Sequence, residues 1–150
     1  MAQANFAAQT QTHAAVIDVL NAGSLGELAD RVDELARLRF GLTIGALALE
    51  GGDTPPGWFT LVEGQATLLL GECRPARLGR IPTAAGLFGV HAPMIESVAL
   101  TRLSLWEPAR QGVMAFGAAD AEAFTDDMGT ELLTFLAKVI ERTVERWPRP

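Results

Sequence analysis

The end of the chain constrains the fold more than any other part of the sequence. The apolar segment 112–117 predicts a buried strand that ends at Gly117, and a polar turn containing aspartates follows it. Apolar residues then recur at helical spacing from about Gly129 to Trp147, and Pro148 stops the pattern. A strand that leads into a closing amphipathic helix predicts a domain in which a helix covers a sheet.

Two further amphipathic helices are predicted at the start of the chain. The first, at 5–22, carries one stripe of mainly apolar side chains, Phe6, His13, Ile17 and Leu20. Ser24 and Glu27 then form a capping box, in which each side chain satisfies a backbone donor, and Gly41 ends the second helix. A stripe on a terminal helix has little of its own chain to cover, so burial against a partner would satisfy it.

The region between the opening and closing helices is predicted to form strands. Apolar runs bounded by turn residues give the candidate strands 42–50, 58–62, 97–106 and 111–117. Residues 66–70 are a further apolar run, whereas 72–82 is predicted to be a loop and 83–93 irregular. The order helix, helix, strands, helix predicts an α+β fold, in which the opening and closing helices cover one antiparallel sheet.

Composition excludes several classes of function. Twelve basic residues against eighteen acidic ones give a net charge of −6, which argues against binding to nucleic-acid phosphates. A single cysteine provides no disulfide within the chain. The N-terminus lacks the pattern of a signal peptide, and no apolar run approaches the roughly 18 residues of a membrane span. We therefore expect a cytoplasmic location with no membrane or nucleic-acid partner.

Several short motifs occur in an order that points to one family. They are Leu87–Gly89, Glu96–Leu100, the strand Gly112–Gly117, Phe124 and Met128–Leu133. Their order resembles the bacterial domain-of-unknown-function 484 family (DUF484), which is GAF-like, over about Phe6 to Trp147. The family has no assigned catalytic residues.

The resemblance implies a GAF-like sheet of about five or six antiparallel strands. The N-terminal and C-terminal helices would pack on one face, and a small-molecule cavity would lie on the other face, beneath the long loops. Residues 1–22 would then form an N-terminal helical segment, and residues 23–150 the GAF-like domain.

Candidates for catalysis and metal binding are few. His13, Cys73 and His91 are widely separated and lack the spacing of metal ligands, so no metal site and no cofactor are predicted. Cys73 with His91 is the one candidate for nucleophilic catalysis, and the favoured interpretation is a structural thiol beside an unrelated histidine. A lone cysteine also cannot complete an intramolecular disulfide cycle. We therefore predict that the chain is not an enzyme.

Two groups of residues are candidates for ligand binding. Arg74, Arg77 and Arg80 lie close together in a predicted loop, and guanidinium groups suit phosphate or carboxylate. Their alternative role is a solvated loop whose charges pair with acidic neighbours. The second group could line a small-molecule cavity or simply fill the core; it comprises Phe88, His91, Ser97, Met114 and Phe116.

Acidic residues before the last helix allow two interpretations. Asp126 and Asp127 could bind a cation or could cap the start of the helix, together with Asp120. Capping is the favoured interpretation.

Two functions follow from these observations. The first is a cytoplasmic, non-enzymatic GAF-like sensory or regulatory domain with a pocket for an unidentified small molecule. The second is a protein-interaction module without a ligand, which forms a homodimer through helices 5–22 and 129–147.

Overall fold

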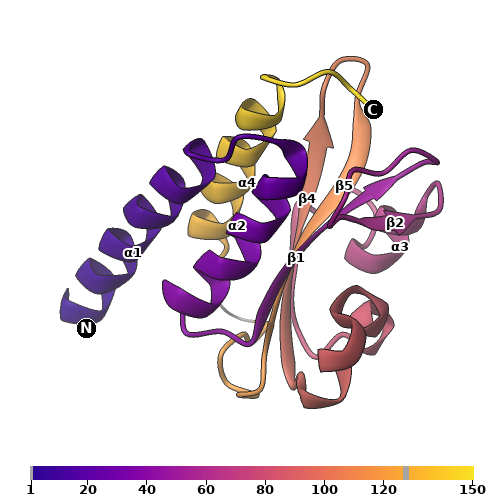
Figure 1. Ribbon diagram of the computed structural model, residues 1–150. Helices are drawn as coiled ribbons and strands as arrows, with labels where there is room; N and C mark the ends of the chain where they lie inside the picture. Colours follow the sequence, from indigo (N-terminus) through magenta and orange to yellow (C-terminus); the bar gives the residue numbers. More distant parts are fainter. Residues whose placement is uncertain (1, 127–128) are drawn as a thin grey trace.

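The computed structural model describes residues 2–126 and 129–150, which form an α+β domain built around one sheet (Figure 1). Five strands lie in the order β2-β1-β5-β4-β3. Helices α1, α2 and α4 cover one face, which we call the helical face, and α3 and η1 cover the other. In chain order the elements are α1 (Ala2–Leu20), α2 (Leu25–Leu38), β1 (Ile44–Glu50), β2 (Phe59–Leu61), α3 (Gln65–Leu70), β3 (Ala76–Gly79), the 3₁₀ segment η1 (Pro82–Met94), β4 (Ser97–Leu105), β5 (Arg110–Ala118) and α4 (Glu131–Val144).

The sheet is mixed, so the prediction of a purely antiparallel sheet is wrong at one edge. Strand β2 pairs with β1 in parallel, from Ala48 opposite Phe59 to Glu50 opposite Leu61, while the other pairs are antiparallel. The connection between these two strands must return along the sheet before β2 begins. It is anchored on the start of α2, because the indole Nε1 of Trp58 donates a hydrogen bond to the Leu25 carbonyl (2.8 Å).

The central hairpin is confirmed, whereas the long connection before it contains more structure than predicted. Strands β4 and β5 pair along their full length from Ser97 opposite Ala118 to Leu105 opposite Arg110. Residues 76–79 form strand β3 inside the predicted loop 72–82. A strand of four residues is not stable alone, and pairing with β4 stabilises this one. Residues 82–94 form η1, which Gly89 interrupts with a non-helical backbone (φ 53°).

The capping box at the start of α2 is present, but the Glu27 carboxylate bonds the amide of Gly23 instead of that of Ser24. The Ser24 hydroxyl accepts a hydrogen bond from the Glu27 amide (3.1 Å), as predicted. The Glu27 carboxylate accepts one from the amide of Gly23 (3.0 Å), one residue before the cap. The two bonds still satisfy donors at the helix entrance that have no partner within the helix.

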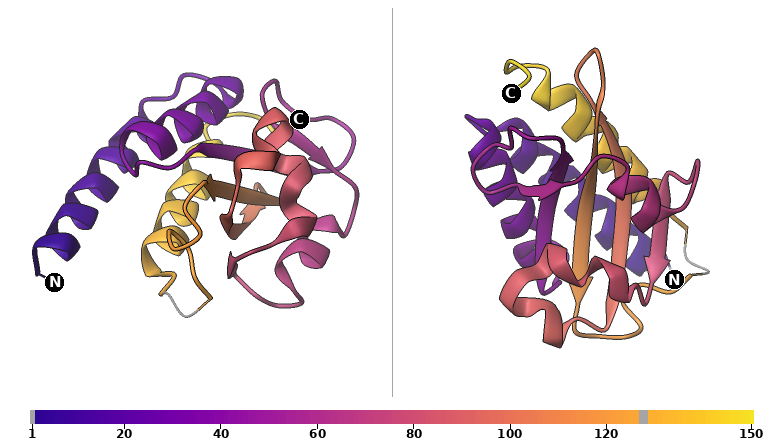
Figure 2. Two further views of the ribbon diagram at one scale, coloured as in Figure 1. Left: turned by 90° about the horizontal axis from the view of Figure 1, so that it is seen from below. Right: turned by 90° about the vertical axis from the view of Figure 1, so that its right-hand side faces the viewer.

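The predicted stripe on the first helix points outward. Ile17 and Leu20 are 59% and 51% exposed, and His13 is exposed too, whereas Ala15 and Val19 are fully buried against the core. The side chain of Phe6 lies outside the described part of the structure. The first half of α1 extends beyond the rest of the domain (Figure 2). The face of α1 that packs against the core is therefore the one that carries Ala15 and Val19. It lies next to the predicted stripe on the surface of the helix.

Alternation along the central strands divides the core into two clusters. On β5, Met114 and Phe116 point to the helical face, while Val113 and Ala115 point to α3 and η1. The two faces of the sheet are thus packed separately. Within residues 2–126 and 129–150, no helix is both long and apolar enough to cross a membrane.

Candidate functional site

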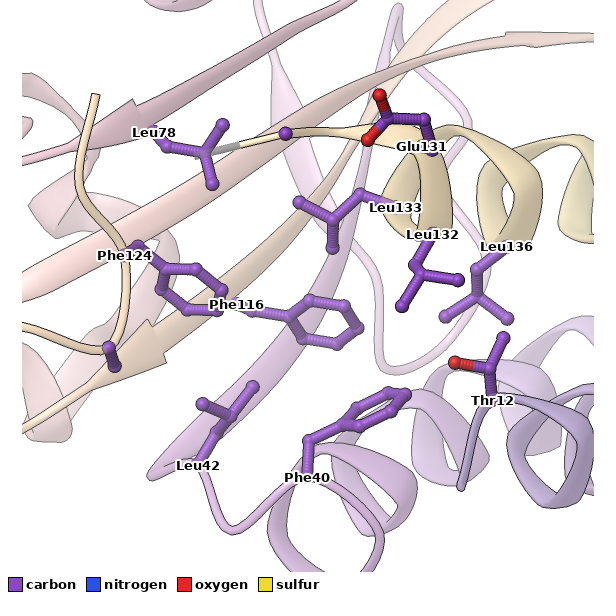
Figure 3. Close-up of a pocket in the computed structure, with 12 residues that line it drawn as sticks. Thr12, Phe40, Leu42, Leu78, Phe116, Phe124, Glu131, Leu132, Leu133 and Leu136 are labelled. Carbon is purple, nitrogen blue, oxygen red and sulfur yellow. The ribbon is translucent and has the colours of Figure 1, made fainter. Parts of the chain in front are cut away.

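A cavity of about 390 Å³ lies on the helical face, between the sheet and the start of α4 (Figure 3). Its walls are mainly large apolar side chains from five separate segments of the chain. They include Phe40, Leu42, Leu78, Phe116, Phe124, Leu132, Leu133 and Leu136. We call this space the apolar cavity. Thr12 and Glu131 are the polar side chains among its described lining residues.

The floor of the apolar cavity depends on a close approach between β1 and α2. The ring of Phe116 packs edge-on against Phe40, with ring centroids 6.1 Å apart and planes at 66°. Gly45 lies opposite Phe116 in the β1–β5 register. A Cβ at Gly45 would sit 2.7 Å from the Val32 carbonyl oxygen and 3.1 Å from the Phe116 ring. The absence of a side chain at this position therefore makes room for both the helix and the ring.

One wall of the apolar cavity is Phe124, and a buried serine holds the backbone of that wall in place. The Ser97 hydroxyl donates a hydrogen bond to the Asp120 carbonyl (2.7 Å) and accepts one from the Phe124 amide (3.2 Å). The Asp120 carboxylate accepts a hydrogen bond from the Glu122 amide (2.9 Å), which closes a tight turn. Ser97 therefore positions the loop that carries Phe124, and it is absent from the described lining of the cavity.

A second hollow, of about 530 Å³, lies against β3, and we call it the arginine hollow. The predicted anion-binding residues Arg74, Arg77 and Arg80 all line it, together with Asp126. Leu78 and Phe124 line both this hollow and the apolar cavity, so the two spaces lie on either side of the same two residues. The structure thus places the three arginines around this hollow, but the Arg77 side chain lies on the face of β3 that α3 covers, opposite the face that carries Leu78.

The three arginines differ in how their side chains are held. Nη1 of Arg77 donates a hydrogen bond to the Leu69 carbonyl (2.9 Å). Arg80 is largely exposed and lies 3.8 Å from a carboxylate oxygen of Glu96, a longer separation than a hydrogen bond. Arg74 is exposed, and its side chain passes close to Gly71. The predicted pairing with an acidic neighbour is present between Arg80 and Glu96, but only as a loose, exposed ion pair.

The sheet separates the remaining predicted ligand residues. Phe88 and His91 belong to η1, on the face opposite α4, where Phe88 is buried and Nδ1 of His91 is buried with no hydrogen-bond partner among the described residues. Met114 and Phe116 lie on the helical face. A smaller hollow of about 210 Å³ lies beneath η1, lined in part by Phe88. The apolar cavity lies on the helical face, opposite the face that the family resemblance implied.

Several lining residues of the apolar cavity were missed by sequence reasoning. Phe40 and Leu42 sit in the short connection after α2, and Leu132 is 44% exposed although the helical pattern predicts it to be buried. The adjacent Leu132 and Leu133 could have indicated this part of the cavity, because together they widen the apolar face of the last helix at its first turn.

The remaining candidate residues for catalysis and metal binding lie in different segments of the chain. Cys73 is exposed in the connection before β3, whereas His91 lies in η1, after that strand. Among the described residues, no group of three or more histidines, cysteines or carboxylates is placed to hold a metal ion. Thr130 occupies the N-cap of α4, so Asp126 does not cap this helix, and Asp127 lies outside the described residues.

Comparison with known proteins agrees with the resemblance seen in the sequence. None of the curated proteins compared with the chain matches it. A family model described as "Protein of unknown function, DUF484" matches residues 1–149, which is nearly the whole chain. The chain therefore belongs to the DUF484 family.

Proposed function

We propose that this protein is a cytoplasmic, non-enzymatic regulatory domain of the GAF-like type that binds a small apolar molecule in the apolar cavity. The observation that carries the proposal is a space of about 390 Å³ walled by Phe40, Phe116 and Phe124 and by leucines. Binding sites for small molecules are typically concave, mostly apolar and about 300–1,000 Å³ in volume. Burial of apolar surface would supply the affinity.

The elements around the apolar cavity support a regulatory role. Thr12 comes from α1, Leu132 from the first turn of α4 and Phe124 from the loop between β5 and α4. A ligand that contacts all three would favour one arrangement of the terminal helices over others, which is how a binding event shifts a conformational equilibrium. The absence of catalysis is proposed because the described lining offers a hydroxyl and a carboxylate but no thiol or imidazole.

Cavity filling tests the proposal. The neutral fluorescent probe N-phenyl-1-naphthylamine should bind to the wild-type protein and be displaced by decanol. Leu132→Trp should abolish binding, because the indole would occupy the cavity from a position that tolerates a larger side chain. Leu68→Trp is the matched control, since Leu68 is 80% exposed on the opposite face. Failure of the wild type to bind the probe or other apolar molecules, or equal binding by Leu132→Trp, would contradict the proposal.

A second function, homodimerisation through α1, is favoured by the outward face of that helix. Ile17 and Leu20 are more than half exposed there, and the first half of the helix extends beyond the rest of the domain (Figure 2). Asp18 is the charged residue of α1, and its carboxylate is paired with Arg39 at 3.0 Å. A second copy of the same helix would therefore cover apolar surface and meet little like-charge repulsion.

Sedimentation over a range of protein concentrations tests this second function. The wild type should be dimeric at micromolar concentration, and the double variant Ile17→Glu with Leu20→Glu should be monomeric. Leu68→Glu introduces a similar charge at an exposed leucine of α3 and should remain dimeric. A wild-type monomer at these concentrations would exclude the dimer.

A further inference from the structure

We infer that the ligand of the apolar cavity is an apolar anion, whose hydrocarbon part fills the cavity and whose carboxylate binds in the arginine hollow. The inference rests on the proposed function and names the class of molecule that the same site would take. It is carried by the adjacency of two spaces with complementary chemistry, one apolar and one lined by Arg74, Arg77 and Arg80.

The adjacency is defined by two residues. Leu78, on β3, and Phe124, in the loop before α4, line both spaces. Figure 3 shows them together at one side of the apolar cavity, away from Thr12 and Phe40. To reach the arginine hollow, a molecule seated against the Phe116 ring would have to pass beside these two side chains.

The chemistry of the cavity walls disfavours a charged group inside the apolar cavity. An ionised carboxylate inside a space walled by phenylalanine and leucine would lose its hydration without compensation. A ligand with a charged end must therefore direct that end out of the cavity. On the side of Leu78 and Phe124, the side chains that receive it are guanidinium groups, which bind carboxylates through paired hydrogen bonds.

The arginines retain the capacity to bind an anion. Nη1 of Arg77 is used by the Leu69 carbonyl, but a guanidinium carries five N–H donors. Arg80 makes only a loose pair with Glu96, and the side chains of Arg74 and Arg80 are exposed. Arg102, by contrast, bonds the carbonyls of Arg74 and Gly71 and the hydroxyl of Thr67, so it supports the framework beneath the hollow.

The balance of charge favours an anion over a cation. The described lining of the arginine hollow includes three arginines and one acidic residue, Asp126, and the Glu96 carboxylate lies 3.8 Å from Arg80. This local excess of positive charge stands in a protein whose net charge is −6. A cationic amphiphile would meet the three arginines on leaving the cavity on this side and should be rejected.

Calorimetric titration with three molecules that share one hydrocarbon chain tests the inference. Decanoate, decanol and decyltrimethylammonium are each titrated into the full chain below their micelle-forming concentrations. Decanoate should bind at least tenfold more tightly than decanol, because hydrogen bonds to charged groups are among the stronger ones. Decyltrimethylammonium should bind most weakly.

Variants test whether the arginine hollow causes the difference between decanoate and decanol affinity. The double variant Arg74→Gln with Arg80→Gln should lose about tenfold in decanoate affinity and leave decanol affinity unchanged. Arg142→Gln is the matched control for loss of positive charge, since Arg142 is exposed on α4 and is absent from the described lining of both spaces. It should leave both affinities unchanged.

The outcomes separate the inference from the proposed function. Equal binding of decanoate and decanol, with both abolished by Leu132→Trp, would overturn the anionic ligand and leave the apolar cavity as a ligand site. Tighter decanoate binding that the double arginine variant does not reduce would also overturn it. Failure of all three molecules to bind would overturn the inference and count against the proposed function as well.

Discussion

The buried hydroxyl of Ser97 accepts a hydrogen bond from the backbone amide of Phe124 at 3.2 Å, which ties the start of β4 to a wall of the apolar cavity. The same hydroxyl donates to the Asp120 carbonyl at 2.7 Å, so one side chain fixes both ends of a short loop segment. Ser97 is 1% exposed, and water cannot readily replace it.

Ser97→Ala should therefore loosen the loop and weaken the cavity wall. We expect a loss of about 1–3 kcal/mol in unfolding free energy, because the buried partners of the hydroxyl are left unsatisfied. Amide hydrogen exchange should accelerate at residues 122–125 more than in β1. Ser104→Ala is the control, since Ser104 is exposed on the same strand. Unchanged exchange in the loop would show that other contacts hold Phe124 in place.

Gly45→Ala should destabilise the helical face of the domain. The added methyl group would lie 2.7 Å from the Val32 carbonyl oxygen and 3.0 Å from the Ala36 Cβ, so α2 would have to move away from β1. We expect a loss of about 1–3 kcal/mol in chemical denaturation, as is typical for overpacking. Gly52→Ala has no atom within 4 Å of the new Cβ and should cost much less. Equal stability of the two variants would refute the close approach at Gly45.

Glu27 should make stability depend on pH in the acidic range. The hydrogen bond from the Gly23 amide, followed by the contact with Arg31, lowers the pKa of Glu27 below its ordinary value of 4.5. A carboxyl group with a lowered pKa stabilises the fold fully above the unfolded value and loses that contribution as the pH falls through the folded value. The stabilisation should thus be present at neutral pH and disappear below pH 4.5.

Urea unfolding of Glu27→Gln at several pH values measures this contribution. The variant should be less stable than the wild type at neutral pH, and the difference should shrink as the pH falls below 4.5. Glu34→Gln changes an exposed carboxylate on the same helix and serves as the control for net charge. A difference that stays constant with pH would show that the charge of Glu27 contributes nothing.

Arg110 should be the arginine whose removal costs the most stability. It is 8% exposed, and its guanidinium donates hydrogen bonds to the carbonyl oxygens of Glu50, Asp53 and Pro150. Burial, and then the charge of Arg149, lowers the pKa of Arg110. The side chain joins the end of β1, the loop after it and the last residue of the chain.

Arg110→Met should therefore lose about 2–3 kcal/mol of unfolding free energy, because the carbonyl groups of Glu50, Asp53 and Pro150 lose a charged donor. Arg110→Lys should recover only part of this, since one ammonium group cannot reproduce the forked geometry of the guanidinium. Thermal and chemical denaturation measure both variants, with the exposed Arg142→Met as the control. Full stability of Arg110→Lys would show that charge alone is needed.

Local patterns predicted most of the regular elements. The spacing of apolar residues located α2, α4 and the β4–β5 hairpin, and Ser24 marked the start of a helix at the correct position. These features depend on neighbours within a few residues, which is why the sequence reveals them. Strand β2 lies within the predicted strand 58–62, but its parallel pairing with β1 was not predicted, because pairing direction depends on how a long loop returns along the sheet. Strand β3 was not predicted, because it is ordered by pairing with β4, which is distant in the sequence.

The candidate site was predicted only in its parts. Arg74, Arg77 and Arg80 were identified as a group, and they do line one hollow. Phe116 was expected to share a cavity with Phe88, but the sheet lies between them. The face on which a strand residue points depends on register, and a shift of one residue reverses it. Phe40 and Phe124 carry no local pattern that indicates a common cavity.

The sequence by itself determined the α+β class, the helices at each end, the central hairpin and membership of the DUF484 family. These follow from periodicity, capping residues and the order of short motifs, all of which are local. Only the tertiary structure decided that Leu78 and Phe124 line both an apolar cavity and an arginine hollow, and that Ser97 holds the Phe124 wall. These relationships join residues that are distant in the chain, and the packing of the sheet against α4 and its preceding loop brings them together.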